Sequence, residues 1–158
     1  MWKLVALALA VGALAAPATA ADRIQVRGSD SGTFSLVPAA PGIFVATDVS
    51  SGVASHLGHY DFLAHETYDA IHNVVTQASF TISTKHGTLS GNYTATLGVG
   101  ATPNIGTYHA PGFITGGTGR YAGATGTIVF DGFGDFLTFT LEDRFTATIV
   151  LSKNGDDD

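Results

Sequence analysis

The last long stretch of the chain alternates apolar and polar side chains with period two, and this alternation constrains the fold more than any other feature. Successive side chains of a β-strand point to opposite faces, so one face of segment 136–151 is predicted to be buried. The apolar set is Leu137, Phe139, Leu141, Phe145, Ala147, Ile149 and Leu151, and the polar set is Thr138, Thr140, Glu142, Arg144, Thr146 and Thr148. Asp143 is the one interruption of the apolar set.

Similar alternation recurs along the chain after the N-terminal segment. In this later part of the chain, helix-forming sequence is nearly absent. Thr, Val, Ile, Phe, Tyr and Gly dominate there, which favours strands. Eight strands are predicted at 24–37, 43–54, 59–67, 74–84, 87–97, 106–115, 124–131 and 136–151. The connections are short, and sequences such as PAAPG at 38–42 and DGFGD at 131–135 are typical of turns.

Short connections make consecutive strands antiparallel neighbours. Eight such strands most economically close into a barrel, because closure removes the exposed edges of an open sheet. We therefore predict an all-β fold, a single-domain, eight-stranded antiparallel up-and-down β-barrel over residues 21–151. An acidic C-terminal tail is predicted at 152–158.

Residues 1–20 have the pattern of a cleaved secretory signal peptide. Lys3 precedes a short apolar run, and Ala18 and Ala20 supply the small side chains that signal peptidase requires. The run is shorter than the ~20 residues that span a bilayer. The protein is therefore expected to be secreted or periplasmic without membrane insertion, and, having no cysteine, to fold without disulfides.

Net charge argues against one class of partner. The chain has seven Lys and Arg against thirteen Asp and Glu, and removal of Lys3 with the signal peptide lowers the basic count to six. Nucleic acids and anionic lipids are bound by clustered Lys and Arg. The composition therefore predicts neither nucleic acid nor a membrane surface as a partner.

The stretch 114–132 contains Gly117-x-Gly119-x-x-Ala122, the spacing of a dinucleotide-binding fingerprint. That fingerprint requires a helix directly after the glycines. The sequence after Ala122, GATGTIVFDG, favours a strand, because Gly, Thr, Ile and Val are poor helix formers. We therefore interpret the stretch as a glycine-rich connection between two strands, and we expect no cofactor.

Three segments together resemble the allene oxide cyclase and dirigent superfamily of eight-stranded barrels. GGTGRYAGATG at 116–126 is similar to a G-G-T-G-R-[FY]-A-G-A-T-G segment of secreted bacterial members of that superfamily. GVASHLGHYDF at 52–62 and HGTLSGNYTAT at 86–96 are similar to two further segments of the same proteins, in the same order. The resemblance covers roughly residues 53–151 and implies an antiparallel barrel with an elongated internal cavity.

The resemblance implies a fold more directly than a reaction. Allene oxide cyclases close an oxylipin ring and dirigent proteins orient the coupling of phenoxy radicals, and both steer a reactive apolar guest with few polar groups. None of their working residues is matched to a position in this sequence. If the protein is an enzyme, the resemblance favours an isomerase-type or cyclase-type activity without a nucleotide cofactor. It also leaves a homo-oligomer, dimeric or trimeric, open.

Asp143 is the candidate catalytic residue. An isolated carboxylate on an apolar barrel face would be desolvated and its pKa raised, which suits a general acid acting on an apolar guest. A bulge that turns Asp143 outward, or an ion pair with Arg144 or Arg120, would instead give it a structural role. The candidate ligand-binding residues are His56, Tyr108, His109 and Asp143.

A metal site is the alternative use of the clustered histidines. His59, Asp61 and His65 share one parity of a predicted strand, whereas His56 falls on the other. His-x-Asp on one face can supply two ligands, but a site needs a third that converges on them, for which His109 is available. We predict no metal and keep His59, Asp61 and His65 as the candidates if one is present.

Aromatic side chains could line a cavity in the barrel. An eight-stranded barrel has the size at which side chains either fill the interior or leave room for one small ligand. The aromatic candidates are Tyr60, Phe62, Tyr68, Tyr93, Tyr108, Phe113 and Tyr121. We predict that the protein binds a small apolar or aromatic molecule there and guides its cyclisation, isomerisation or coupling. The alternative is a non-enzymatic extracellular structural or interaction module with a packed barrel.

Overall fold

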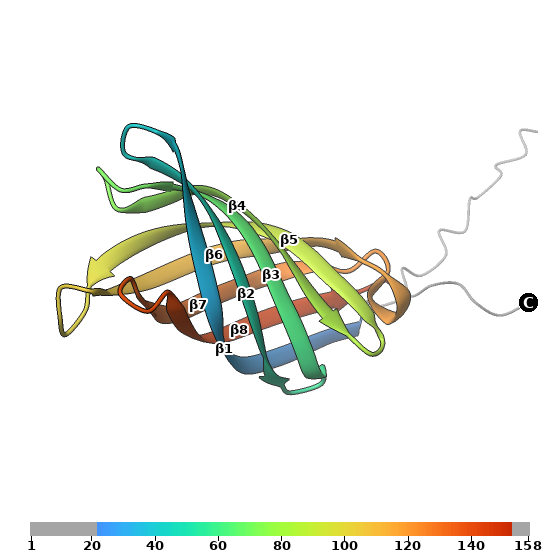
Figure 1. Cartoon of the computed structure of the whole chain (residues 1–158). Helices are drawn as coiled ribbons and strands as arrows, with labels where there is room; N and C mark the ends of the chain where they lie inside the picture. The colour runs from blue at the N-terminus through green and yellow to red at the C-terminus, as the bar shows by residue number, and fades with distance from the viewer. Residues whose placement is uncertain (1–21, 153–158) are drawn as a thin grey trace, which may run out of the picture.

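The chain forms a closed barrel of eight antiparallel strands connected in sequence order, as described for residues 22–152 by a computed structural model (Figure 1). The strands are β1 (Asp22–Ala40), β2 (Ile43–Ala54), β3 (Gly58–Asp69), β4 (Val74–Thr84), β5 (Gly87–Val99), β6 (Ile105–Gly117), β7 (Thr125–Asp135) and β8 (Thr140–Leu151). A 3-10 helix, η1 (Gly119–Tyr121), connects β6 to β7. β8 pairs with both β7 and β1, which closes the sheet and confirms the predicted fold class.

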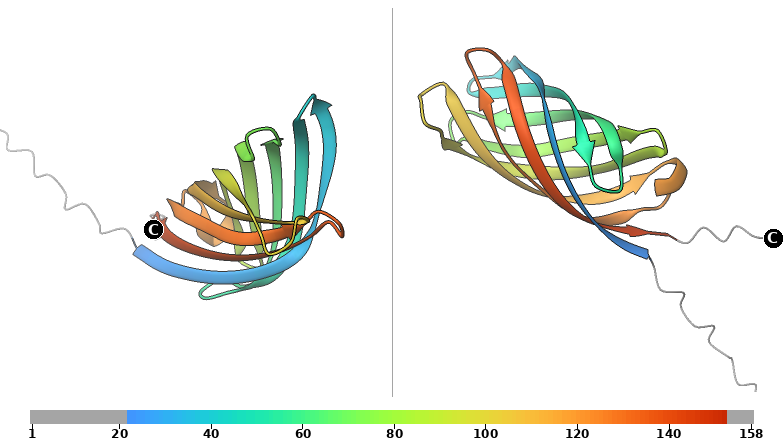
Figure 2. Two further views of the ribbon diagram at one scale, coloured as in Figure 1. Left: turned by 90° about the vertical axis from the view of Figure 1, so that its left-hand side faces the viewer. Right: turned by 90° about the horizontal axis from the view of Figure 1, so that it is seen from below.

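The predicted signal peptide at 1–20 and the end of the predicted acidic tail lie outside the described residues. Within residues 22–152, no helix is long and apolar enough to cross a membrane. β1 is the longest strand, and residues 28–33 of it are paired on both sides, with β2 and with β8. Figure 2 shows β1 curving across the barrel as it passes from one partner to the other.

The last hairpin differs from the sequence prediction. DGFGD is not a turn, because β7 continues through it to Asp135, and the turn falls at 136–139 instead. Leu137 and Phe139, which were predicted to face the core, therefore lie in this turn and are 77% and 44% exposed. The reason is that Gly132 and Gly134 hold inward positions of an unbroken strand, where they leave space for side chains from neighbouring strands.

The two ends of the barrel are built differently. The β1–β2, β3–β4, β5–β6 and β7–β8 connections gather at one end, on the left in Figure 1, which we call the mouth. The β2–β3 and β4–β5 turns and η1 lie at the other, the closed end. The core of the closed end consists of almost completely buried residues, namely Val26, Leu57, Ile82, Leu89, Tyr121, Ile128 and Ile149.

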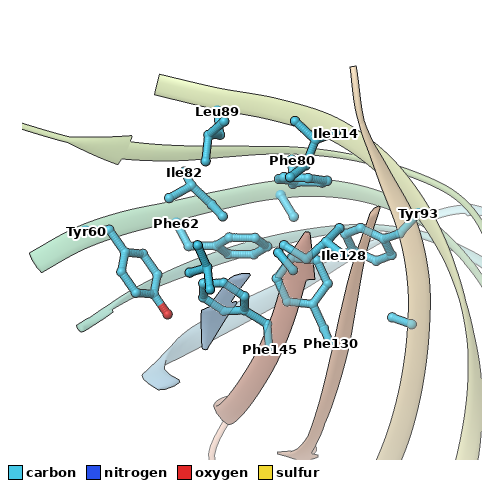
Figure 3. Close-up of a cluster of buried hydrophobic side chains, with 14 of the residues drawn as sticks. Tyr60, Phe62, Phe80, Ile82, Leu89, Tyr93, Ile114, Ile128, Phe130 and Phe145 are labelled. Carbon is cyan, nitrogen blue, oxygen red and sulfur yellow. The ribbon is translucent and has the colours of Figure 1, made fainter. Parts of the chain in front are cut away.

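An aromatic cluster fills the middle of the barrel, with Phe130 of β7 at its centre. The Phe130 ring centroid lies 5.4 Å from that of Phe62 and 5.6 Å from that of Phe80. Phe145 lies 5.8 Å away on its other side. Figure 3 shows these rings turned toward one another from different strands. Edge-to-face and tilted contacts of this kind stabilise a core beyond the area that they bury.

The glycine-rich stretch is a connection between strands, as the sequence predicts. After Gly117 the chain makes a single 3-10 turn and enters β7, so no α-helix follows the glycines. The Thr118 and Thr88 hydroxyls lie 2.9 Å apart, and Arg120 N–H donates to His86 O over 2.9 Å. Tyr121 is 1% exposed and fills the closed end.

Gly119 supports a test of this connection, because it combines a positive φ with a close backbone contact. Its φ is +57°, and a Cβ there would lie 2.4 Å from His86 O; Gly58 has a φ of +75° with nothing within 4 Å. Gly58→Ala should cost about 1 kcal/mol, from backbone strain alone. Gly119→Ala should cost at least about 1 kcal/mol more, because the connection must also shift. Denaturant unfolding measures both, and equal costs would contradict the close approach.

Candidate ligand-binding site

Four carboxyl groups face the interior of the barrel. Asp30 of β1, Asp48 of β2, Glu66 of β3 and Asp143 of β8 occupy the inward parity of their strands, in line with buried or half-buried apolar neighbours. Every Lys, Arg and His side chain within residues 22–152 is exposed. The inward carboxyl groups are therefore not neutralised by any cationic side chain of this part of the chain.

Asp143 is bound by Tyr108, and Gly132 makes their contact possible. Tyr108 of β6, Gly132 of β7 and Asp143 of β8 are direct cross-strand neighbours, and the Tyr108 hydroxyl donates a hydrogen bond to Asp143 Oδ1. A Cβ at Gly132 would lie 2.3 Å from Asp143 Oδ1 and 2.7 Å from the Tyr108 hydroxyl. Glycine at this position leaves room for the Tyr108 phenol to reach a carboxyl group two strands away.

Asp30 is bound in the same way on the other side. Tyr60 of β3, Gly52 of β2 and Asp30 of β1 are cross-strand neighbours, and the Tyr60 hydroxyl donates to Asp30 Oδ2 over 2.5 Å. A Cβ at Gly52 would lie 2.6 Å from the Asp30 Cβ. Two Tyr-Gly-Asp triplets thus lie on the barrel wall.

The two triplets meet, because Asp30 and Asp143 are paired directly across β1 and β8. The result is one continuous row over six strands, in the order Tyr60, Gly52, Asp30, Asp143, Gly132 and Tyr108. We call it the tyrosine–aspartate row. The order of residue types is the same from either end, with two carboxyl groups at the centre of the row and a phenol at each end.

A third phenol and carboxyl pair lies nearer to the mouth. The Tyr93 hydroxyl of β5 donates to Glu66 Oε1 of β3, and Ala78 of β4 is the cross-strand neighbour of both. Again a small side chain separates the two partners. Asp48 lies near this pair, and its carboxyl group experiences the negative charge of Glu66 without a compensating hydrogen bond.

Burial raises the pKa of each inward carboxyl group. For Asp143 the pKa rises to about 7, because of burial, while the Tyr108 hydrogen bond lowers it and the charges of Asp30 and Glu66 raise it. For Asp48 it rises to about 8, through burial and then repulsion by Glu66, Asp143 and Asp30. Burial also raises the pKa values of Asp30 and Glu66, against the lowering effect of their tyrosine donors.

The tyrosines remain proton donors. Burial raises the pKa of the Tyr60, Tyr93 and Tyr108 hydroxyls above the ordinary value of tyrosine, and the partner carboxyl groups raise it further. Each hydroxyl therefore keeps its proton across the physiological range. The phenol can orient a carboxyl group without competing with it for the titrating proton.

A cavity of about 70 Å³ lies between the aromatic cluster and the mouth. Its polar wall consists of Asp48, Glu66, Tyr93, Tyr108 and Asp143, and its apolar wall includes Phe62, Phe130, Val75, Ala95 and Leu97. The volume is below the roughly 300–1,000 Å³ of sites that enclose drug-sized ligands. A guest with an aromatic ring must therefore extend into the mouth.

Three aromatic rings surround the mouth of this cavity. The Phe136 ring, from the β7–β8 turn, has its centroid 5.3 Å from that of Phe34 on β1 and 6.5 Å from that of Tyr68 on β3. Phe139 in the same turn has a φ of +56°, which is strained for a residue with a side chain. Phe136 lies on a short turn and not within a strand, so its displacement would widen the mouth for a larger guest.

Two of the predicted ligand-binding residues come together and two do not. Asp143 and Tyr108 form the pair described above, and Asp143 faces inward, away from exposed Arg144 and Arg120. His56 is exposed in the β2–β3 turn at the closed end. His109 points outward from β6, with Nδ1 2.6 Å from Asp131 Oδ1. Neither histidine faces the cavity.

The residues considered for a metal lie on the outer surface. His59 and Asp61 border an open polar groove lined by residues of β1, β2, β3, β4, β7 and β8. His65 is exposed, with Nδ1 3.2 Å from Thr47 Oγ1. Within residues 22–152, no three His, Cys, Asp or Glu side chains are grouped to hold a metal ion.

Most of the aromatic candidates face the interior. Tyr60, Phe62, Tyr68, Tyr93 and Tyr108 point inward, whereas Phe113 is 62% exposed on the outside and Tyr121 belongs to the closed end. Asp30, Asp48 and Glu66 were not among the predicted site residues. Asp30 and Glu66 share the parity of inward apolar residues on their strands, and that signal could have identified them. The parity of Asp48 is ambiguous, because Val45, Val49 and Val53 make the outward face of its strand apolar as well.

A comparison with solved structures finds the same barrel elsewhere. The chain is similar to the structure of the pterocarpan synthase dirigent protein GePTS1, with a TM-score of 0.57 and 12% sequence identity over 90% of this chain and 92% of that chain. No protein-family model and no curated protein matches the sequence. The chain thus has a dirigent-like eight-stranded barrel fold, and its resemblance to allene oxide cyclases and bacterial members stays a prediction.

The raised pKa values predict that the protein loses stability as the pH rises. A carboxyl group with a folded-state pKa of about 7 or 8 binds more protons when folded than when unfolded, where aspartate titrates near 4. The free energy of unfolding should therefore fall by roughly 1 kcal/mol per pH unit for each group, from pH 5 to about 7 for Asp143 and to about 8 for Asp48. Denaturant unfolding over this range measures the slope.

Asp143→Asn should flatten that slope, and exposed Asp61→Asn should leave it unchanged. The surface residues Asp69 and Asp135 have lowered pKa values, so they make the protein more stable as the pH rises, and they do so only at lower pH. Stability that increases from pH 5 to pH 8 would contradict the burial of un-neutralised carboxyl groups.

Gly132→Ala tests the close approach within the tyrosine–aspartate row. The new methyl group would overlap Asp143 and Tyr108, so the pair should separate and stability should fall by about 2 kcal/mol. Gly116→Ala is the matched control on β6, because its Cβ would meet nothing nearer than Ser90 Oγ at 3.7 Å. Denaturant unfolding compares the two, and equal stability would show that the row tolerates a side chain at this position.

Proposed function

We propose that the protein binds a small apolar or aromatic molecule at the mouth and cavity of the barrel, and that Asp143 and Tyr108 transfer or hold a proton on it. The reaction guided in this way is a cyclisation, isomerisation or coupling. The observation that carries the proposal is a carboxyl group with a pKa of about 7, held by a phenol on the wall of an aromatic-lined cavity.

The chemistry follows from the protonation state of Asp143. A carboxyl group with a pKa near 7 is present in both forms at neutral pH, so it can donate a proton to a guest and recover it within one cycle. Tyr108 contacts Oδ1, which leaves Oδ2 for the guest. Apolar walls keep water away from the reacting atoms and strengthen the electrostatic effect of the carboxyl group.

Two further observations support this assignment. The similar solved structure is named as a pterocarpan synthase dirigent protein, so a protein described as a synthase uses this barrel. The signal-peptide sequence of residues 1–20 supports a secreted or periplasmic location for the activity. Neither observation specifies the substrate, which has to be argued from the cavity.

The alternative function is a structural or interaction module that uses only the outside of the barrel. The small size of the cavity favours it, because the closed end and the middle are already filled by side chains. The two functions differ in whether a guest enters past Phe136.

Native mass spectrometry of the protein purified from its own host should reveal a co-purifying small molecule. Asp143→Asn preserves the size of the side chain and removes its acid, so binding should persist while conversion of that molecule falls about 10²-fold or more. Exposed Asp61→Asn is the control and should behave as wild type. Protein that is consistently empty would support the packed module, and so would an Asp143→Asn variant with full conversion.

A further inference from the structure

We propose that the cavity binds an organic cation, in the form of an ammonium group carried on an aromatic or apolar body. The inference rests on the proposed function for the location of the site and goes beyond it in naming the chemical class of the guest. The ammonium group would lie among the inward carboxyl groups, and the apolar body would lie in the mouth between Phe34, Tyr68 and Phe136.

The first argument is an imbalance of charge. The inward polar groups are carboxyls on β1, β2, β3 and β8, and phenols on β3, β5 and β6. The inward positions of β4 and β7 beside them are apolar or glycine, as at Val75, Ala78, Phe130 and Gly132. A neutral guest would leave the ionised members of this set without a counter-charge, whereas an ammonium group would supply one.

The second argument is an imbalance of hydrogen-bonding groups. Three phenols supply three donors, and each is already used by one carboxyl oxygen. On the wall of the cavity, the Tyr93 and Tyr108 hydroxyls are used by Glu66 and Asp143, and Asp48 accepts no hydrogen bond from either phenol. Asp30 and Ser50, which interact with each other, lie outside the cavity wall.

The surplus carboxyl oxygens on the cavity wall are costly to bury, and they define what a guest must bring. An ammonium group has up to three N–H donors and no acceptor, so it matches a site with surplus acceptors. Asp48 adds two carboxyl oxygens that no hydrogen bond stabilises. A phenol or alcohol guest supplies one donor and brings further acceptors of its own, which is a poorer match.

The walls of the cavity are consistent with an organic cation and not with a metal ion. Phe62, Phe130 and Tyr93 present aromatic rings to the same space, and such rings attract ammonium groups. Within residues 22–152, the carboxyl groups are not grouped to hold a metal. The 70 Å³ cavity accommodates an ammonium head, while a ring attached to it must occupy the mouth.

Protons compete with the cation for this site. In the empty barrel Asp48 and Asp143 hold protons near neutral pH, and a bound ammonium group would lower both pKa values and release them. The groups that face Asp48 are Glu66, Asp143 and Asp30, together with the Tyr93 and Tyr108 phenols. Cation binding should therefore strengthen from pH 6 to pH 8.

Isothermal titration calorimetry with two probes of matched shape tests the inference. The probes are 2-phenylethylammonium and neutral 2-phenylethanol, each titrated at pH 6, 7 and 8 in two buffers that differ in ionisation enthalpy. The ammonium probe should bind at least tenfold more tightly than the alcohol at pH 8. Its affinity should rise severalfold from pH 6 to 8 with release of close to one proton, and the alcohol should show neither effect.

Two variants locate the site. Asp48→Asn should weaken the ammonium probe about tenfold and leave the alcohol unaffected, whereas Asp61→Asn, which removes an exposed carboxylate from the outside, should change neither. Phe136→Ala should open the mouth and tighten both probes. If Asp48→Asn does not fold, proton release by the wild-type protein decides the question alone.

The outcomes separate this inference from the function on which it rests. Equal affinity for both probes, or tighter binding of the alcohol, would overturn the cation inference while supporting a guest site in the barrel. Ammonium binding that is unaffected by pH and by Asp48→Asn would place the cation elsewhere and overturn the inference too. Absence of binding by both probes, even to Phe136→Ala, would count against the cation and the guest site together.

Discussion

Hydrogen bonds from buried phenols to buried carboxyl groups are the interactions on which the interior of this barrel depends. Three such pairs occur, Tyr60 with Asp30, Tyr108 with Asp143 and Tyr93 with Glu66, and in each the partners are separated by one strand. A phenol is long enough to cross that strand only if the residue between is small, and these residues are Gly52, Gly132 and Ala78. The pairs therefore determine which positions must carry a small side chain or none.

Closure of the sheet brings the polar residues together. Asp30 lies near the middle of the first strand and Asp143 near the start of the last, yet the β1–β8 pairing makes them direct neighbours. Without that pairing, two separate Tyr-Gly-Asp triplets would lie at opposite edges of an open sheet. With it they form one row in which the charge of Asp30 raises the pKa of Asp143. The site is thus a property of the closed barrel and of no single hairpin.

The fold could be predicted from alternation and turn chemistry, while the site could be predicted only in part. Asp143 was identifiable because it alone interrupts a long apolar parity, and Tyr108 because it is aromatic. Glu66 shares the inward parity of Phe62 and Ala64, so its orientation could have been read from the sequence. Asp48 lies on a strand whose outward face is also apolar, with Val45, Val49 and Val53 exposed, so parity alone could not orient it. The prediction of a turn at DGFGD was wrong, because glycine occurs both in turns and where strands approach closely. Only the register across β6, β7 and β8 distinguishes these two uses of glycine.

The division of the barrel into a packed end and a carboxyl-lined end explains how one small domain tolerates so many buried acids. The closed end and the aromatic cluster around Phe130 bury large apolar side chains with little exposed area, which contributes most of the favourable free energy of folding. The carboxyl groups oppose folding, since each is desolvated without a cation. A sequence selected for stability alone would place apolar residues at these positions. Their presence beside a cavity supports the proposal that the mouth half of the barrel holds a guest, while the closed half supplies the apolar packing that holds the sheet together.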